Sequence, residues 1–469
     1  MKILYIGAGF VGTCSAAVMA DSGHDVLLYD IDQTKISKLG SNDVSTIESC
    51  LFEEGLADML IKNQEKIKFT ADYNQVKDEL DIVDAIFMCL PTPEKTESSG
   101  ESDLTYYNIA AQQLAQSLAS RNGGAQTKYV LIINKSTVPI DMVDDTEKMM
   151  RDSGVVNFGV ASNPEFLVEG KAIHDSLYPD RIVVGAWQVQ DFEIIRSIYE
   201  KFIRIQNIKY IEVNPKEAAA GKLLANYYLM SKLANCFEVM GRTSESFDNL
   251  NFENLKKIIG TDPRIGANDW GLYSSFFAGG SCFIKDTASL TYQLEKKGAD
   301  VSYIKQSLLI NNKQRDNFYK RAQVQAGFDY QDKTVAILGV AFKQNTNDIR
   351  NSGAIDIVYH LIDDGAKEIK IYDPAATPMF KNLFNAEKDS RYKIISYFNS
   401  EKEALVGTDV CMILTDWSKF REAGDTIKQV CPPPYLIMDG RRMLATQFDE
   451  LQNLGYDIIA VGSPFLKGK

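Results

Sequence analysis

The 469-residue sequence has little of several features that mark particular protein classes. Its three histidines, His24, His174 and His360, stand too far apart to form a local metal-binding motif. Its seven cysteines are scattered without a C-x-x-C pair, which is typical of reduced thiols in a cytosol. Basic residues are the minority, with 51 Lys and Arg against 63 Asp and Glu, so nucleic acid and anionic membranes are unfavourable partners. We therefore expect a cytoplasmic protein that needs no metal ion.

Long apolar runs and internal repeats are also missing. No apolar run approaches the roughly 20 residues that a transmembrane helix needs. A strand is expected from Lys2 onward, which leaves no room for a signal peptide. The chain is too long for one hydrophobic core, so we expect two or three domains.

The first 30 residues carry a recognisable strand–turn–helix–strand pattern. The apolar strand Lys2–Ile6 precedes a glycine-rich turn, Gly7-Ala8-Gly9-Phe10-Val11-Gly12. The small-residue stretch Thr13–Asp21 is expected to be a helix, and the strand Asp25–Tyr29 ends on Asp30. A G-x-G-x-x-G turn inside a β-α-β unit, with an acid at the end of the second strand, predicts dinucleotide binding.

Each part of this fingerprint has a physical role. Gly7 permits the tight turn, Gly9 lets a pyrophosphate reach the helix N-terminus, and Gly12 lets the helix lie close to the strand. The alternatives are a purely structural turn or another nucleotide-like ligand, such as a methyl donor. Asp30 can accept hydrogen bonds from both ribose hydroxyls and would repel a 2′-phosphate, which favours NAD over NADP, although the nearby Lys35 complicates that preference.

Alternating strands and helices continue over about the first 200 residues, which predicts a parallel, doubly wound sheet. Its further strands are expected at Ala85–Cys89, Tyr129–Ile133 and Arg181–Val184. The segment from Lys216 to about Met240 has helical spacing of apolar residues and one glycine, so it predicts a long helix. Ser302–Ala326 is expected to be helical too.

A second alternating region opens at Thr334. Its strands are expected at Thr334–Leu338, Lys370–Tyr372, Val410–Leu414, Tyr435–Met438 and Asp457–Val461. We therefore predict an α/β protein with two Rossmann-like, doubly wound domains joined by a mainly helical middle domain with a long central helix. The expected boundaries are 1–210, 211–328 and 329–469.

A reactive-thiol pattern lies in the middle region, Gly279-Gly280-Ser281-Cys282-Phe283-Ile284-Lys285-Asp286. We expect the glycine pair to let a substrate approach the backbone closely, and Cys282 to attack an aldehyde carbon. Lys285 and Asp286 can manage charge and protons around the thiol. A cysteine by itself is usually a small buried hydrophobe. Beside a hydride acceptor, however, a thiol suits the oxidation of an alcohol through an aldehyde to an acid.

Polar residues follow the expected strand ends, where open parallel sheets bind ligands. They include Thr92 in a Leu-Pro-Thr-Pro run, Ser136 and Thr137 in a Lys-Ser-Thr-Val-Pro run, and Glu165. Thr137 is a hydroxyl that could position water. The structural alternative is that the prolines merely end strands and that Glu165 is solvated.

Further polar residues allow two interpretations. Lys222 and Asn226 stand four apart and share a helix face, either as an exposed polar stripe or as donors to an oxyanion. Four basic residues beside glycines or strand ends suit nucleotide phosphates, but each could be an ordinary surface charge: Arg264, Lys343, Arg350 and Arg441.

Taken together, these motifs resemble the UDP-glucose/GDP-mannose dehydrogenase family, over essentially the whole chain and in the same order. The motifs are GAGFVG with Asp30, CLPTP, KSTVP, SNPEFL with Glu169-Gly170, PDR, KLLAN, DPRIG, GGSCFIKD, VAFKQNTNDIR and DGRR. The resemblance implies oxidation of the C6 hydroxyl of a nucleotide sugar to a carboxylate, with two NAD and one water. It implies a thiohemiacetal and then a thioester on Cys282.

The resemblance also implies residue roles. Lys222 and Asn226 would stabilise the oxyanion, Asp286 and Thr137 would hold and activate water, and Glu165 would assist as acid or base. The implied cofactor contacts are Gly7, Gly9, Phe10, Val11, Gly12, Asp30, Lys35, Thr92, Ser136, Thr137, Glu169 and Arg350. The implied substrate contacts are Glu165, Phe166, Leu167, Lys222, Asn226, Arg264, Gly279, Cys282, Phe283, Lys343 and Arg441.

The resemblance also implies a role for each domain. The first domain would bind NAD and the middle domain would form the dimer. The third domain would bind the nucleotide end of the substrate, across a cleft from NAD. Arg264 would reach the active site of a neighbouring subunit, so a homodimer or larger homo-oligomer is expected, with the long middle helix at its core.

Three departures from the family pattern lie near the expected sugar pocket. Phe277-Ala278 stand directly before Gly279-Gly280, where the family usually has a glycine and an aromatic residue. The loop from Arg264 to Cys282 is about two residues longer than in common members. Val168 stands where alanine or arginine is common. We expect UDP-glucose as substrate, with GDP-mannose or a UDP-N-acetylhexosamine as alternatives. A non-catalytic NAD-binding sensor would be expected to lack Cys282, Lys222 or Asp286, and all three are present.

Overall fold

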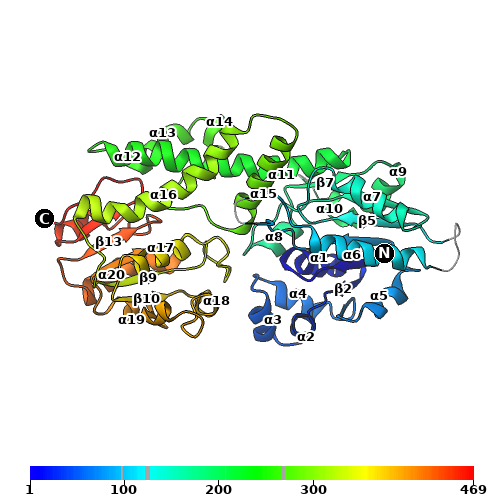
Figure 1. Cartoon of the computed structure of the whole chain (residues 1–469), viewed down its shortest axis with the longest axis horizontal. Helices are drawn as coiled ribbons and strands as arrows, with labels where there is room; N and C mark the ends of the chain where they lie inside the picture. Colours follow the sequence, from blue (N-terminus) through cyan, green and yellow to red (C-terminus); the bar gives the residue numbers. More distant parts are fainter. Residues whose placement is uncertain (97–98, 122–126, 206–207, 267–269) are drawn as a thin grey trace. The chain divides into compact units, whose positions relative to one another are not determined.

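A computed structural model describes residues 1–96, 99–121, 127–205, 208–266 and 270–469 (Figure 1). The chain divides into two compact units. Unit 1 comprises Met1–Ala225 and Ala288–Ala299, and unit 2 comprises Asn226–Thr287 and Asp300–Lys469. Two helices therefore contribute residues to both units, α11 (Pro215–Asn235) and α15 (Ser281–Lys296).

Unit 1 is built on an eight-stranded sheet with the order β3-β2-β1-β4-β5-β6-β7-β8. The strands are β1 (Lys2–Ile6), β2 (Asp25–Tyr29), β3 (Ile67–Thr70), β4 (Ala85–Met88), β5 (Val130–Asn134), β6 (Phe158–Ser162), β7 (Arg181–Gly185) and β8 (Lys209–Val213). The sheet is parallel, as predicted, except at one junction. β6 and β7 pair antiparallel through Ser162 and Gly185, because the parallel β7–β8 pair joins the rest of the sheet in the reverse direction.

Both faces of this sheet are covered, as expected for a doubly wound fold. Ile3 and Tyr5 of β1 point into one apolar core, whereas Leu4 and Ile6 point into the other, which follows from the alternation of side chains along a strand. The helices of unit 1 are α1 (Phe10–Asp21), α2 (Gln33–Leu39), α3 (Val44–Cys50), α4 (Leu56–Lys62), α5 (Tyr73–Glu79), α6 (Thr105–Ala119), α7 (Met142–Asp152), α8 (Ala172–Leu177), α9 (Val189–Ile198) and α10 (Glu200–Ile203).

The middle of the chain is helical, as predicted. The long helix expected from Lys216 is α11, but it ends at Asn235 and continues as a wider π-helical turn, Cys236–Gly241. The other helices are α12 (Arg242–Ser246), α13 (Phe252–Gly260), α14 (Pro263–Gly266), α15 and α16 (Ser302–Ala326). The α16 helix stops where Gly327 takes a left-handed conformation (φ = 64°), which glycine adopts without strain.

Unit 2 contains a six-stranded parallel sheet with the order β11-β10-β9-β12-β13-β14. Its strands are β9 (Thr334–Leu338), β10 (Glu368–Tyr372), β11 (Ile395–Tyr397), β12 (Val410–Ile413), β13 (Leu436–Asp439) and β14 (Asp457–Ala460). Its helices are α17 (Gly353–Asp363), α18 (Thr377–Leu383), α19 (Glu401–Leu405), α20 (Ala423–Val430) and α21 (Phe448–Asn453). The three-residue β11 was not predicted, since so short a segment carries no periodic signal.

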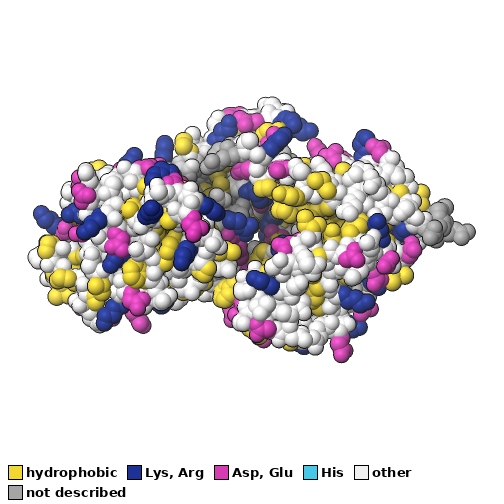
Figure 2. Space-filling model, turned by 60° about the horizontal axis from the view of Figure 1, so that its bottom comes forward, with side chains coloured by type: hydrophobic (Ala, Val, Ile, Leu, Met, Phe, Trp, Pro, Cys, Tyr) yellow, Lys and Arg dark blue, Asp and Glu magenta, His cyan; other side chains and the backbone are white. Residues whose placement is uncertain are grey.

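The surface carries both signs of charge. Figure 2 shows basic and acidic side chains interspersed over the visible face, so the formal net charge of −12 is not gathered into one acidic patch there. Within the described part of the chain, every helix is too short or too polar to cross a membrane.

Candidate active site

The glycine-rich turn after β1 has the geometry that its sequence predicts. Gly7 has φ = 104°, a region that glycine enters without strain, and its N–H donates to the Tyr29 carbonyl over 2.8 Å. A Cβ at Gly7 would lie 2.3 Å from the Cys89 carbonyl oxygen, so a larger residue cannot fit. The helix α1 begins at Phe10 rather than at the expected Thr13, because the last residues of the fingerprint already form its first turn.

The other two glycines of the fingerprint differ in what surrounds them. A Cβ at Gly12 would lie 2.0 Å from the Gly7 carbonyl oxygen, which is the close approach of helix and turn that was expected. Gly9 is the N-cap of α1, and a Cβ there would meet nothing within 4 Å. The position that a side chain would occupy at Gly9, directly before α1, is therefore open. A helix N-terminus with open space before it suits a phosphate.

Asp30 follows β2 and holds this turn in place. Its Oδ2 accepts the Ala8 N–H over 2.8 Å and the Lys35 ammonium over 3.2 Å, and its Oδ1 accepts the Asp32 N–H over 3.0 Å. A carboxylate offers about four acceptor positions, so Asp30 keeps capacity for a further donor such as a ribose hydroxyl. Lys35 is thus a direct partner of the acid that was expected to select NAD.

The loops after β4 and β5 are tied together at the carboxyl ends of these strands. The Thr92 hydroxyl donates to the Thr137 carbonyl over 2.8 Å, and the Ser136 hydroxyl donates to the Leu90 carbonyl over 2.7 Å. Their prolines end strands, but their hydroxyls also cross-link two loops. This places Thr92, Ser136 and Thr137 together at the ligand-binding edge of the sheet.

Glu165 and Lys222 form a buried ion pair in unit 1. Their Oε1 and Nζ atoms are 3.1 Å apart, and the two side chains are 8% and 4% exposed. Burial alone would raise the pKa of Glu165, but the Lys222 ammonium and the Leu167 N–H, which donates to Oε2 over 2.6 Å, outweigh it and leave the pKa lowered. The alternative of a solvated glutamate is wrong, and Glu165 is held as a carboxylate at neutral pH.

Phe166 and Glu169 flank this pair along the same loop. The Arg181 guanidinium lies 3.9 Å from the centre of the Phe166 ring and the Lys222 ammonium 5.3 Å, so two cations contact one aromatic ring. Next to Glu169, the Gly170 N–H donates to the buried Glu53 carboxylate over 2.5 Å. Glu53 was not predicted, since a glutamate between two short helices gives no local signal.

Unit 2 contains Cys282, Lys285, Asp286 and Asn226, which we call the thiol cluster. Cys282 lies in the first turn of α15 and is the exposed one among the seven cysteines, of which Cys50 is intermediate and the others are buried. Asp286 is one helical turn further on and 1% exposed, and it accepts the Asn226 amide over 2.5 Å and the Lys285 ammonium over 2.7 Å. Since Lys222 and Asn226 are 3% and 4% exposed, the alternative of an exposed polar stripe on α11 is wrong.

The glycine pair before Cys282 has a packing role, beside which the expected close approach of a substrate stays a prediction. A Cβ at Gly279 would lie 2.6 Å from the Asn351 carbonyl oxygen, and a Cβ at Gly280 would lie 2.8 Å from the Phe342 ring. Gly280 also has φ = 90°. The space that a side chain would occupy at either glycine is thus filled by protein of unit 2. The pair is needed so that the segment from Phe342 to Asn351 can pack against the start of α15.

The two unusual residues before this pair are buried. Phe277 and Ala278 are 4% and 7% exposed; the Phe277 Cβ lies beside Gly353, and the Phe277 ring centre lies 5.4 Å from the Arg315 guanidinium. Both belong to the apolar cores of unit 2, so their side chains pack within the protein, and their nearness to a sugar pocket stays a prediction. Phe283, on α15, is partly buried and packs edge-on against Trp270 at 6.2 Å between ring centres.

The four candidate phosphate-binding cations have different surroundings. Arg264 and Arg350 each chelate an acid two residues before them and are 87% and 63% exposed. Arg441 instead donates to the carbonyls of Leu414 and Phe342, both over 2.9 Å, and is fixed to the carboxyl edge of the second sheet. Lys343 follows β9, with its ammonium 5.7 Å from the centre of the Phe342 ring.

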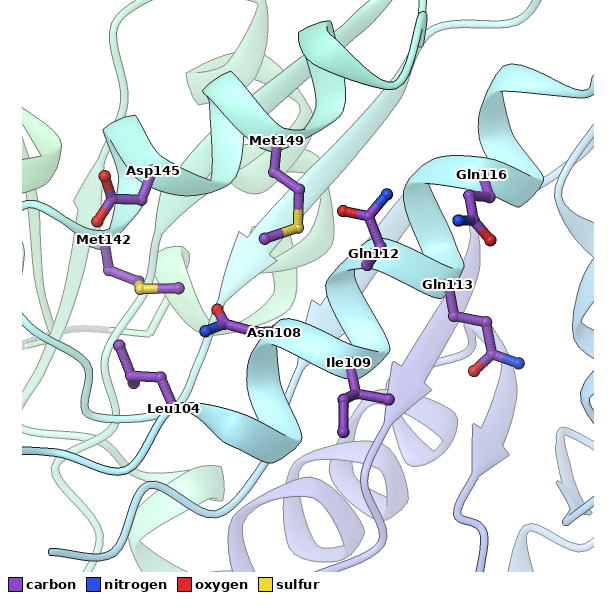
Figure 3. A pocket seen from close by; sticks show the side chains of 9 residues that line it. All are labelled: Leu104, Asn108, Ile109, Gln112, Gln113, Gln116, Met142, Asp145 and Met149. Carbon is purple, nitrogen blue, oxygen red and sulfur yellow. The ribbon is translucent and has the colours of Figure 1, made fainter. Parts of the chain in front are cut away.

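An open groove of about 660 Å³ lies between α6 and α7 (Figure 3). Glutamines such as Gln112 and the methionines Met142 and Met149 line it, and Asp145 is its ionisable residue. It holds no nucleophile and no paired acid and base. In the described ranges of the chain, no three His, Cys, Asp or Glu side chains gather as a metal site.

Three consecutive parts of the chain match domains of the UDP-glucose/GDP-mannose dehydrogenase family. The NAD binding domain matches residues 1–203, the central domain residues 216–313 and the UDP binding domain residues 336–446. This order is the predicted architecture of two α/β domains around a helical one. The boundaries 1–210, 211–328 and 329–469 stay a prediction.

Relatives match over nearly the full length. A UDP-glucose 6-dehydrogenase of Rickettsia felis is 34% identical over 464 residues, covering 99% of this chain and 96% of the relative. A UDP-glucose 6-dehydrogenase of Bacillus subtilis is 32% identical over 478 residues, covering 100% and 94%. A solved UDP-glucose dehydrogenase of the archaeon Pyrobaculum islandicum is 25% identical and superposes with a TM-score of 0.82 over 95% of both chains.

Proposed function

This chain belongs to the UDP-glucose/GDP-mannose dehydrogenase family, and we propose that it oxidises the C6 hydroxyl of UDP-glucose to the carboxylate of UDP-glucuronate. It is an NAD-dependent oxidoreductase that binds a nucleotide sugar. The choice of UDP-glucose is supported by the names of its full-length relatives. The thiol route is supported by the exposed Cys282 one turn from the buried Asp286.

The proposed reaction consumes two NAD and one water for each sugar. When bound, NAD supplies the two-electron acceptor for each of two successive oxidations. The first oxidation turns the C6 alcohol into an aldehyde, and the Cys282 sulfur then bonds to C6 to give a thiohemiacetal. The second oxidation gives a thioester, and water breaks the C–S bond to release the acid and the thiol.

The thiol cluster of unit 2 is suited to the covalent steps. Cys282 is at the start of a 16-residue helix, whose partial positive charge stabilises a thiolate. Asp286 is held by Asn226 and Lys285, which fixes its carboxylate in one orientation. We assign to Asp286 the proton of the attacking water, and to Asn226 a hydrogen bond to the oxyanion formed at C6.

The ion pair of unit 1 is suited to the proton transfers at the hydroxyl. The lowered pKa makes Glu165 a base rather than an acid at neutral pH. Its partner Lys222 is a buried ammonium, which can stabilise a negatively charged oxygen more strongly than an exposed one could. Thr137, at the end of β5, is assigned the positioning of water through its hydroxyl.

The remaining contacts follow the same assignment. We propose that NAD is bound through the open turn at Gly9, through Asp30 and through Thr92, with Glu169 and Arg350 as further contacts. The implied substrate contacts are Phe166, Leu167, Arg264, Gly279, Phe283, Lys343 and Arg441. The homodimer also stays a proposal, with the exposed Leu224, Tyr228 and Val239 of the long helix and its π turn as candidate interface residues.

The test is the amount of NADH formed per sugar consumed, with UDP-glucose, UDP-N-acetylglucosamine, UDP-galactose and GDP-mannose compared in parallel. Two NADH per UDP-glucose is the expected result. One NADH would contradict the thioester route, since the reaction would then stop at the aldehyde. Two NADH with a different sugar would keep the chemistry and replace the substrate. No NADH with any of them would favour an NAD-binding sensor.

A further inference from the structure

The lysine of the Lys135-Ser136-Thr137-Val138-Pro139 run is buried, although the mechanism above gives it no role. Lys135 directly follows β5 and is 7% exposed. It lines a small cavity of about 50 Å³ in unit 1, whose walls include Ser15 of α1, Glu165 and Arg181 of β7. A buried ammonium is costly unless other groups balance its charge. Its neighbours therefore decide what it does.

The direct partners of Lys135 are neutral. Its Nζ donates to the Asn163 side-chain oxygen over 3.0 Å and to the Tyr199 hydroxyl over 3.3 Å, and the same Tyr199 hydroxyl donates to Asn163 over 2.7 Å. The Asn163 amide in turn donates to the Val183 carbonyl over 2.8 Å. These bonds fix the position of Lys135, but they supply no negative charge.

Among the titratable groups around Lys135, Glu165 is the buried anion. Burial raises the pKa of Cys89, at the end of β4, to about 12 even though Lys135 lowers it, and burial raises the pKa of Tyr5 on β1 well above its usual range. Both are therefore neutral near pH 7. Asp175 of α8 and Arg181 of β7 lie at the cavity wall, and Lys222 of α11 pairs directly with Glu165.

Two buried ammonium groups thus accompany one buried carboxylate. Lys222 contacts Glu165 at 3.1 Å, whereas Lys135 acts on it through space and through the chain, because Asn163 is two residues before Glu165. In the proposed reaction, Lys222 must also stabilise a negatively charged oxygen. The positive charge of Lys135 remains near Glu165 during that step and would keep Glu165 ionised.

We propose that Lys135 is a positioning residue for Glu165, which it keeps as a carboxylate and orients through Asn163. This inference rests on the proposed function, since it deepens the role of Glu165 there. It assigns to the lysine of this run a part in setting the pH range of catalysis. The hydroxyls of Ser136 and Thr137 would then be held by the same loop whose lysine tunes the base.

The first test is the pH dependence of kcat/KM with UDP-glucose for wild type, Lys135→Met, Lys135→Arg and Tyr199→Phe. For Lys135→Met, the acidic limb should move up by roughly 0.5–1 pH unit, because an opposite charge near a carboxyl is lost. Lys135→Arg should restore the limb, and Tyr199→Phe should keep it, since the ammonium remains. An unmoved limb in Lys135→Met, whatever its rate, would overturn the proposal.

A second test needs no turnover. Denaturant unfolding of wild type, Lys135→Met, Glu165→Gln and the double variant at pH 7 and pH 4 measures the coupling of the two residues. Glu165 has a lowered pKa in the folded state, so its stabilising charge is present above the unfolded pKa and is lost as pH falls through the folded pKa. The coupling should be positive at pH 7 and shrink at pH 4. Strictly additive losses at both pH values would make Lys135 a purely structural residue. A wild type inert towards every nucleotide sugar would contradict the proposed function and leave this coupling intact.

Discussion

The two α/β sheets of this chain begin with nearly the same turn, at Gly7 in unit 1 and at Gly339 in unit 2. Both glycines have a positive φ, 104° and 91°, and each N–H donates over 2.8 Å to the last residue of the neighbouring strand, Tyr29 or Tyr372. In both, an added Cβ would collide with a residue just beyond the other neighbouring strand, Cys89 after β4 at 2.3 Å and Thr415 after β12 at 2.4 Å. The backbone therefore follows one rule in both units.

The acids that end the second strands differ in how many donors they hold. Asp30 accepts three hydrogen bonds and keeps acceptor capacity. Asp373 is 4% exposed and accepts five, from the N–H groups of Val340, Ala341, Ala375, Ala376 and the Trp417 ring. Five donors fill a carboxylate, so Asp373 has nothing left for a ribose hydroxyl.

The start of the following helix differs as well. In unit 1, α1 begins at Phe10, three residues after the turn glycine, and the Cβ position of its N-cap Gly9 is open. In unit 2, α17 does not begin until Gly353, whose own Cβ position is filled by Phe276 and Phe277. One topology thus offers a phosphate site and a usable acid in unit 1, and a closed, structural version of both in unit 2. Ligand choice follows from the groups left available rather than from the fold.

The largest expected effect falls outside both turns. Cys282→Ala should lower the rate of NADH formation by roughly 10³-fold or more, because no other exposed cysteine can form the thioester. Binding of NAD and of UDP, measured by calorimetry, should stay within about threefold, since neither turn is touched. NADH formation at the wild-type rate would remove the thiol from the mechanism.

The acids of the two turns should respond differently in stability. Asp373→Ala leaves five donors without their acceptor and should lower the free energy of unfolding by about 3 kcal/mol or more. The matched Asp30→Ala should cost about 1 kcal/mol, since Asp30 binds fewer donors near solvent. Urea unfolding of the two variants compares them. Equal losses would break the contrast between a structural acid and an available one.

Asp30→Ala should also affect the binding of NAD and of UDP differently. Asp30→Ala should weaken NAD binding by roughly 10-fold, the value of a hydrogen bond to a charged group, and leave UDP binding unchanged. Titration calorimetry with each ligand provides the comparison, and Lys35→Ala serves as the neighbouring control. If NAD and UDP were weakened alike, the effect would be one of folding rather than of a ribose contact.

The smallest effect is the contribution of Glu165 to stability, which is expected at neutral pH and disappears at acid pH. The lowered pKa of Glu165 means that its ion pair with Lys222 stabilises the protein above the unfolded pKa and is lost as pH falls through the folded one. Wild type and Glu165→Gln should therefore differ most near pH 7 and converge below about pH 4. Thermal unfolding between pH 3 and pH 7 measures this. A constant difference across that range would contradict the assignment of the charge to Glu165.

Much of the fold could be predicted because apolar runs and glycine turns act locally. The strands β1, β2 and β9 and the helix α16 lie at the predicted residues, and the acid after β2 faces the turn as expected. Short elements such as β11, and the reversed pairing at Ser162, depend on partners distant in sequence and could not be read from a single segment.

The environment of several candidate site residues could not be predicted from the sequence. Cys282 is exposed and Glu165 is paired, but the buried Phe277 and Ala278 show that an unusual residue beside a catalytic motif can serve packing alone. Glu53 and Lys135 were missed as site-supporting residues because charged side chains are usually exposed, and only their burial reveals their role.

The sequence by itself determined the glycine turn after β1, the acid after β2 and the spacing of Cys282 and Asp286, since these depend on local backbone geometry. Tertiary structure decided which of the two acids keeps acceptor capacity, which lysine lies buried near Glu165, and what fills the space beside Gly279 and Gly280. The physical reason is that hydrogen-bond capacity and burial are set by segments far apart in sequence that meet only in the folded chain.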